Sequence, residues 1–330
     1  MKDVGTSEQI HRFIDDLELS LDMEFGPMPK FRNIILCGMG GSGITGDMVA
    51  DLLLDVSPVP IRTLKSTELP NWAGTDTLVV VSSYSGNTLE TREVYKQALE
   101  KGCRVVVITS GGALKAMSDE NGNDLILMPE DMHPRHSIGF MIGYTLSVLR
   151  SAGCGDISSK IKDSIPGLRR YRDTLESKDG TCLPLEMARS FIDHVPVICA
   201  DRRFGSVILR WKTQFNENSK YVAFCTPSDE FVHGGLCSCK WRDVLSLTVL
   251  VGSRDDSTAE VIDTLDRSGI CYRRVDFDGD SEMENFFRMV MLGDFISMHM
   301  AVIRGIDPAS VRPITQLKSI LGMINNDRAQ

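Results

Sequence analysis

Short apolar runs alternate with amphipathic stretches along the first half of the chain. The runs cover residues 33–37, 77–82, 103–109 and 124–128, and stretches of helical periodicity follow them at 44–54, 89–101, 113–120 and 138–150. Continuous apolar runs are typical of a parallel sheet that helices cover on both faces. We therefore predict a doubly wound α/β unit over residues 1–153. An N-terminal helix at 6–21 precedes it, with Thr6 and Gln9 as a capping box.

The second half of the chain repeats this rhythm more loosely. Apolar runs cover 195–200, 221–225, 244–251 and 271–277, and helical stretches cover 207–219, 258–266, 283–304 and 314–324, with a loop expected after 225. In both halves, therefore, an apolar run ends in polar turn residues and a helix follows them. The pattern predicts two related parallel-sheet subdomains with helices on both faces, joined near 153–158, the second covering 154–330.

Composition and charge narrow the possible partners. The 330 residues are about twice a typical domain, and 42% hydrophobic with 25% charged residues indicates an ordered globular protein. The net charge of −9 disfavours a nucleic-acid partner or an anionic membrane surface. No secretory signal opens the chain, and its longest apolar stretch, near 286–302, is interrupted by Arg288, Asp294 and His299. We expect a cytoplasmic protein without a membrane role.

The cysteines do not predict a metal site. Nine of them in a chain without a signal peptide are expected to be reduced thiols. Cys237 and Cys239 form a C-x-C pair beside His233, but no second Cys/His pair lies at zinc-finger spacing. We therefore expect no bound metal.

A glycine-rich turn, Gly38-Met39-Gly40-Gly41-Ser42-Gly43, follows the first apolar run directly. Glycines let the backbone approach an anion closely, and the next helix offers unpaired N–H groups and the positive end of its dipole. A dinucleotide site is the competing interpretation. The next strand, however, ends in Lys65 and Ser66, without the carboxylate that would bind a ribose hydroxyl.

A second polar turn follows the strand at 77–81. Its sequence, Ser82-Ser83-Tyr84-Ser85-Gly86-Asn87-Thr88, carries four Ser and Thr hydroxyls in seven residues, although helix capping needs only one. Turns at the carboxyl ends of neighbouring parallel strands meet at one crevice, where α/β sheets bind ligands. The two turns together predict a site for a phosphate monoester.

At this point the chain resembles a known family. The two turns resemble the sugar isomerase (SIS) domain, and three further motifs follow them in order: Pro134-Arg135-His136-Ser137 with Gly139, Phe140 and Gly143; the segment 210–220, RWKTQFNENSK; and Asp307-Pro308 with Lys318 after it. A histidine, His233, lies sixteen residues after Glu217. In this order the motifs resemble the bifunctional phosphoglucose/phosphomannose isomerases over nearly the whole chain.

The resemblance implies a role for each matched residue. It implies phosphate contacts from Gly41, Ser42, Ser83, Ser85 and Thr88, and it implies Arg135 near the reacting carbons. It also implies Glu217 as the proton-transfer base, His233 as the ring-opening acid and Lys318 as a second ring-opening group. Without the resemblance, Glu217 is interpreted as a solvated acid at a helix end, His233 as a surface histidine and Lys318 as a helix-terminal cation.

The implied reaction interconverts glucose 6-phosphate, and mannose 6-phosphate, with fructose 6-phosphate through a cis-enediol. It is a step of glycolysis and gluconeogenesis that needs no cofactor or metal, and the family implies a homodimer whose His233 enters the neighbouring subunit's site. Two departures from the family pattern stand out. Val232 and Gly234 replace the amides that usually flank His233, with Gly235 after them, and Val311 replaces a small hydroxyl residue. A phosphosugar-binding regulator, or an isomerase of another sugar phosphate, is the alternative.

Overall fold

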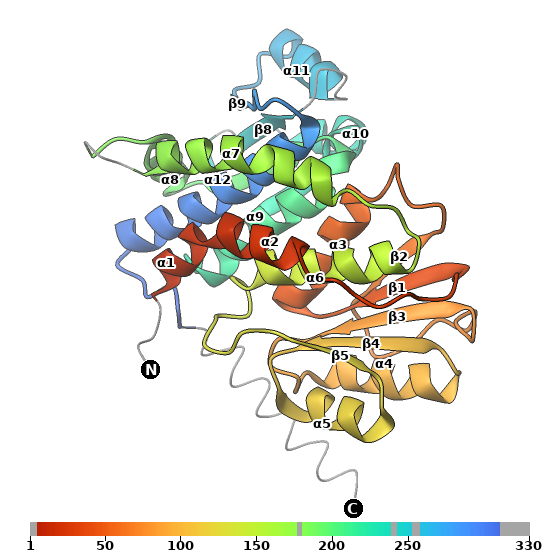
Figure 1. Cartoon of the computed structure of the whole chain (residues 1–330). Coiled ribbons are helices and arrows are strands. Elements are labelled where there is room, and N and C mark those ends of the chain that lie inside the picture. Colours follow the sequence, from red (N-terminus) through yellow and green to blue (C-terminus); the bar gives the residue numbers. More distant parts are fainter. Residues whose placement is uncertain (1–4, 177–179, 239–242, 253–257, 311–330) are drawn as a thin grey trace, which may run out of the picture. The chain divides into compact units, whose positions relative to one another are not determined.

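The computed structural model describes residues 5–176, 180–238, 243–252 and 258–310. Its described residues form two compact units, one ending at Ser159 and the other spanning Lys160–Ser310. Each unit holds one parallel sheet with helices on both faces, which confirms the predicted fold class (Figure 1). The subdomain boundary expected between 153 and 154 precedes this division by a few residues.

The first unit is built on a five-stranded parallel sheet, sheet A, with the order β2-β1-β3-β4-β5. Its strands are β1 (Asn33–Cys37), β2 (Ile61–Leu64), β3 (Thr77–Ser82), β4 (Arg104–Thr109) and β5 (Asp124–Leu127). Its larger helices are α3 (Gly40–Leu52), α4 (Leu89–Glu100), α5 (Gly112–Asn121) and α6 (Ile138–Ser151). Strand residues such as Ile35, Val79 and Val105 pack against α4 and α5, while α3 and α6 cover the other face (Figure 1).

The N-terminal helix is divided at Arg12 into α1 (Thr6–His11) and α2 (Phe13–Leu21). The predicted capping box is wrong, because Gly5 is the N-cap and no side chain caps α1. Gln9 is buried instead and uses its amide elsewhere. Its side-chain oxygen accepts a hydrogen bond of 2.8 Å from the backbone N–H of His133.

Helices α2 and α6 pack at close range. A methyl group on Gly143 would overlap the Ser20 side chain, so only glycine fits there. The Ser20 hydroxyl donates to the carbonyl oxygen of Gly139, one turn earlier in α6, at 3.1 Å. The two motif glycines of α6 therefore serve helix packing. Asp16 lies in the same contact region, where burial raises its pKa to about 6 although Arg12 pairs with it at 3.1 Å.

The second unit is built on a four-stranded parallel sheet, sheet B, with the order β7-β6-β8-β9. Its strands are β6 (Val195–Ala200), β7 (Phe224–Pro227), β8 (Leu245–Val251) and β9 (Arg273–Asp276). Its helices include α8 (Leu183–Phe191), α9 (Gly205–Glu217), α10 (Ser228–His233), α11 (Thr258–Arg267) and α12 (Glu282–Ile303), with the short turns η1 (Arg202–Phe204) and η2 (Gly235–Ser238). One core cluster joins Cys199 and Val249 of the sheet to Phe231 of α10 and Leu265 of α11.

The second half departs from the sequence predictions at two places, and one further prediction falls on residues that the structure does not describe. Helices α7 (Ser158–Leu175) and α8 were not predicted. Helix α7 carries Pro166 in its interior, where a proline usually breaks a helix because it lacks the N–H for a backbone hydrogen bond. The loop expected after residue 225 is wrong, because Pro227 ends β7 and the acidic Ser228-Asp229-Glu230 opens α10. The helix expected at 314–324 lies outside the described residues.

Helix α12 is the core helix of the second unit. By length and composition it could cross a membrane, but 67% of its most apolar window is buried inside the protein. Asp294 of α12 pairs with Arg210 of α9 at 2.7 Å, and both side chains are almost fully buried. The indole N–H of Trp211 donates to the carbonyl oxygen of Met289 at 2.8 Å. These contacts fix α9 on α12.

Candidate functional site

The glycine-rich turn forms the first turn of α3. The helix begins at Gly40, four residues earlier than predicted, and Met39 is its N-cap in an extended conformation. No side chain caps this helix within the described chain. The backbone N–H groups of Gly41 and Ser42 belong to the first turn of α3, where the helix dipole stabilises a bound anion. The Ser42 N–H also donates to the carbonyl oxygen of Met39 at 3.1 Å.

The hydroxyl-rich turn lies beside the glycine-rich turn, because β1 and β3 are neighbouring parallel strands with Cys37 opposite Val81. Thr88 is the N-cap of α4, yet its side chain does not cap the helix. Its hydroxyl instead accepts a hydrogen bond of 3.1 Å from the buried Ser83 hydroxyl, whereas Ser85 is exposed. The hydroxyl groups of this turn therefore do not cap α4.

Arg135 lies against the glycine-rich turn. A methyl group on Gly41 would lie 2.7 Å from the carbonyl oxygen of Pro134 and 3.0 Å from the Cα of Arg135. Only glycine allows this approach, and the Arg135 side chain is buried. The first unit therefore gathers the predicted substrate-binding residues at the carboxyl edge of sheet A.

Glu217 is the last residue of α9, and it is half-buried. The apolar residues that were expected to hold this helix, Val207, Trp211 and Phe215, are fully buried. The Lys220 ammonium donates to the carbonyl oxygen of Glu217 at 2.6 Å. It also donates to the carbonyl oxygens of Asp307 at 3.1 Å and Pro308 at 3.4 Å. The end of α9 is therefore held firmly.

His233 is the last residue of α10, and its side chain is exposed. Helix α9 begins after β6 and leads to the start of β7, which is parallel to β6, so Glu217 lies at the amino edge of sheet B. Helix α10 follows β7 directly, so His233 lies at the carboxyl edge. The structure thus does not bring Glu217 and His233 of one chain together. Lys318, and Cys239 of the C-x-C pair, lie outside the described residues.

The carboxyl edge of sheet B differs chemically from that of sheet A. A hollow of about 870 Å³ lies there, and its lining includes Asp263, Asp266, Asp276, Asp278 and Asp280. Such a lining repels a phosphate.

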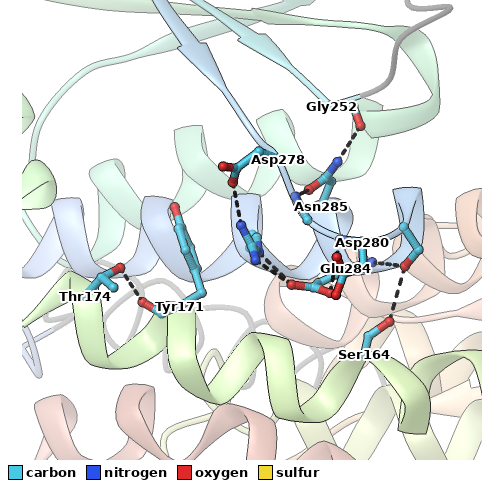
Figure 2. Close-up of polar contacts among 11 residues, drawn as sticks. Ser164, Tyr171, Thr174, Gly252, Asp278, Asp280, Glu284 and Asn285 are labelled. Atoms are coloured by element: carbon cyan, nitrogen blue, oxygen red, sulfur yellow. Dashed lines mark hydrogen bonds and ion pairs between the residues drawn. The ribbon is translucent and has the colours of Figure 1, made fainter.

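A polar network holds the wall of this hollow. Glu284 accepts from Arg288 at 2.6 Å, and Arg288 also pairs with Asp278 at 2.8 Å. Arg288 lies over the Tyr171 ring, 4.9 Å from its centroid. Figure 2 shows Asp278 and Asp280 above α12, with Asn285 bonded to Gly252.

Comparisons with known proteins identify the family of this chain. A family profile described as "Bacterial phospho-glucose isomerase C-terminal SIS domain" matches residues 183–321. A bifunctional phosphoglucose/phosphomannose isomerase from Thermoplasma volcanium is 30% identical over 316 residues, covering 94% of this chain and 98% of the relative. The chain belongs to the bifunctional phosphoglucose/phosphomannose isomerase family.

Two further similarities place this family member among related proteins. A D-glucosamine-6-phosphate 4-epimerase from Sulfolobus acidocaldarius is 29% identical over 260 residues, covering 78% of this chain and 81% of the relative. A solved glucose-6-phosphate isomerase from Chlamydia trachomatis superimposes with a TM-score of 0.72 at 15% identity, covering 98% of this chain and 74% of that one. The latter likeness establishes the fold alone.

Sequence reasoning missed several residues that hold the site of this isomerase-family protein. The phenol of Tyr84 and the amide of Gln9 bond to the backbone two to three residues before Arg135. The Lys220 ammonium bonds to the carbonyl oxygen of Glu217 itself. Nothing in periodicity or spacing identifies them, since their partners are distant in the sequence or are backbone atoms. Tyr84 lies inside the hydroxyl-rich turn and Lys220 inside the segment 210–220, and this position is their only signal in the sequence.

Proposed function

We propose that this protein is a sugar-phosphate isomerase that interconverts glucose 6-phosphate, and mannose 6-phosphate, with fructose 6-phosphate. Membership of the isomerase family over nearly the whole chain is the observation that carries the proposal. The donor-rich turns at the carboxyl edge of sheet A support it, because they suit a phosphate monoester. Binding the phosphate, which is remote from the reacting carbons, supplies positioning energy for the reaction.

In the proposed mechanism, the phosphate is bound by residues of the two turns: Gly41, Ser42, Ser83, Ser85 and Thr88. His233 and Lys318 open the sugar ring. Glu217 then carries one proton between C1 and C2 through a cis-enediolate, and Arg135 offsets the negative charge that develops on the oxygens. The half-buried position of Glu217 at the fixed end of α9 supports its role, because a general base must be held in place.

The opposite positions of Glu217 and His233 on sheet B favour a site shared between subunits. We therefore propose a homodimer in which His233 of one subunit acts with Glu217 of the other. We place this enzyme in the cytoplasm, in line with its membership of a family of metabolic isomerases.

A coupled assay on fructose 6-phosphate tests the proposal, with the product aldose identified by chromatography. We expect glucose 6-phosphate and mannose 6-phosphate as products. The similarity to a glucosamine-phosphate epimerase favours one second candidate, an isomerase or epimerase of an amino-sugar phosphate. Turnover of glucosamine 6-phosphate without turnover of fructose 6-phosphate would support that candidate. Tight sugar-phosphate binding without turnover of either would indicate a regulator.

A further inference from the structure

Arg135 follows a loop, residues 129–134, whose backbone is bonded by the side chains of Tyr84 and Gln9. Tyr84 reaches this loop from the hydroxyl-rich turn. Its phenol donates to the carbonyl oxygen of Pro129 at 2.9 Å and accepts from the N–H of Met132 at 2.8 Å. One hydroxyl therefore spans both ends of the segment 129–132, three residues before Arg135.

Tyr84 is itself fixed at its backbone. Its carbonyl oxygen accepts from the backbone N–H of Ser110 at 2.9 Å and from the Ser110 hydroxyl at 2.7 Å, at the end of β4. The ring is buried. Burial also raises the pKa of the phenol, so its proton stays available for donation at neutral pH.

The rest of the loop has two further supports. The Gln9 amide accepts from the N–H of His133 at 2.8 Å, and Gly41 contacts the backbone of Pro134 and Arg135. Asp131, between the two residues that Tyr84 bonds, has a left-handed backbone with φ of 63°. A non-glycine residue in this conformation costs free energy that the surrounding contacts must offset. The loop therefore depends on these supports for its shape.

We propose that Tyr84 is a positioning residue that couples the phosphate-binding turn to Arg135. The inference rests on the proposed function, because it assigns Tyr84 to the same site. A phosphate bound at Ser83 and Ser85 orders the turn that contains Tyr84, and the phenol transmits this order to the loop before Arg135. Tyr84 touches no reacting atom. It acts by holding the Arg135 guanidinium where charge develops in the transition state.

The test compares Tyr84→Phe with Tyr95→Phe. Tyr95 is a matched control, because its buried phenol also makes two hydrogen bonds in the same unit, to the Met117 carbonyl at 2.8 Å and to Asn123 at 2.6 Å. Neither bond involves the Arg135 loop. Tyr84→Phe should lower kcat by about 10- to 100-fold while KM for fructose 6-phosphate changes less than about threefold. Tyr95→Phe should leave both constants near wild type.

A double-mutant cycle separates positioning from general support. Tyr84→Phe should have almost no further effect on kcat in an Arg135→Ala background, because both changes remove the same contribution. Full multiplication of the two single effects would overturn the inference. A rise in KM with unchanged kcat would also overturn it, since Tyr84 would then support phosphate binding alone.

Hydrogen exchange keeps the inference separate from the proposed activity. The amides in residues 129–136 should exchange faster in Tyr84→Phe than in wild type or Tyr95→Phe, whatever the enzyme's substrate is. Unchanged exchange there would show that Tyr84 does not hold the loop, even in an active isomerase. A wild-type protein that turns over no sugar phosphate, with faster exchange in the variant, would instead refute the proposed function alone.

Discussion

Glu217 and His233 lie at opposite edges of sheet B, although only sixteen residues separate them in the sequence. Helix α9 carries the chain from the carboxyl edge of the sheet, where β6 ends, back to the amino edge, where Glu217 is its last residue. Its 13 residues span about 20 Å. Local geometry therefore separates the proposed base from the proposed ring-opening acid. In the proposed homodimer, a site that uses both residues combines two copies of the chain.

Subunit mixing tests this composite site. Glu217→Gln and His233→Ala should each be inactive alone, and mixed dimers should regain activity at the site that keeps both native residues. We expect recovery of up to about a quarter of wild-type activity after random exchange, since half of the dimers are mixed and each has one intact site. Mass spectrometry would verify the mixed dimers. Verified mixed dimers without activity would show that each site lies within one chain.

Glu217→Gln should also separate chemistry from binding. Glutamine keeps the shape of the side chain but removes its basic oxygen, so kcat should fall by about 10²- to 10⁴-fold while substrate still binds. Exchange of solvent deuterium into C1 or C2 should be lost, because exchange requires the enediolate. Ser85→Ala is the comparison, and it should raise KM while exchange persists once substrate is bound. Near-native exchange in Glu217→Gln would make Glu217 a structural residue.

Turnover should survive exhaustive EDTA treatment, because Arg135 and the acid–base groups supply the charge stabilisation that a Lewis acid would otherwise give. The assay is run before and after dialysis against chelator, with metal content measured in both samples. Loss of activity that zinc or manganese restores would contradict the proposed mechanism.

Gly143→Ala should destabilise the first unit by about 1–3 kcal/mol, because the added methyl group overlaps the Ser20 side chain in the contact between α2 and α6. Urea unfolding followed by circular dichroism measures this change. Gly74→Ala is the control, since its added methyl group would meet no atom within 4 Å. Equal effects of the two substitutions would mean that α2 and α6 can separate at little cost.

Asp16 should make stability depend on pH in an unusual direction. The folded protein holds the Asp16 proton up to about pH 6, whereas the unfolded chain releases it near 3.8. This carboxyl therefore contributes stability below 3.8 that is lost as the pH rises through 6. Between pH 5 and pH 7.5, wild type should lose about 1 kcal/mol of stability relative to Asp16→Asn, as measured by urea unfolding. Glu8→Gln, which removes an exposed carboxylate of α1, is the control. A constant difference between wild type and Asp16→Asn would contradict this behaviour.

The sequence by itself determined the family and most strands of both sheets, whereas β7 lies at Phe224–Pro227 and not at the predicted 221–225. Buried strands such as β3 and β6 were predicted at their observed bounds. A strand that helices cover on both faces needs apolar side chains at almost every position, so its sequence is a continuous apolar run. The two polar turns after β1 and β3 were also evident, since side chains at the ends of neighbouring strands converge wherever the strands are parallel. Two helices of the second unit could not be predicted from the sequence pattern. Helix α7 contains a proline, and α10 has only six residues.

Tertiary structure alone decided how the site residues are held. The contact of Gly41 with Arg135, the span of the Tyr84 phenol across the loop at 129–132, and the pairing of Arg210 with Asp294 each join segments far apart in the chain. Their partners are backbone atoms or single side chains, which leave no periodic trace in the sequence. The separation of Glu217 from His233 has the same origin. Only sixteen residues separate them in the sequence, but strand β7 crosses the sheet between them and leaves one at each edge.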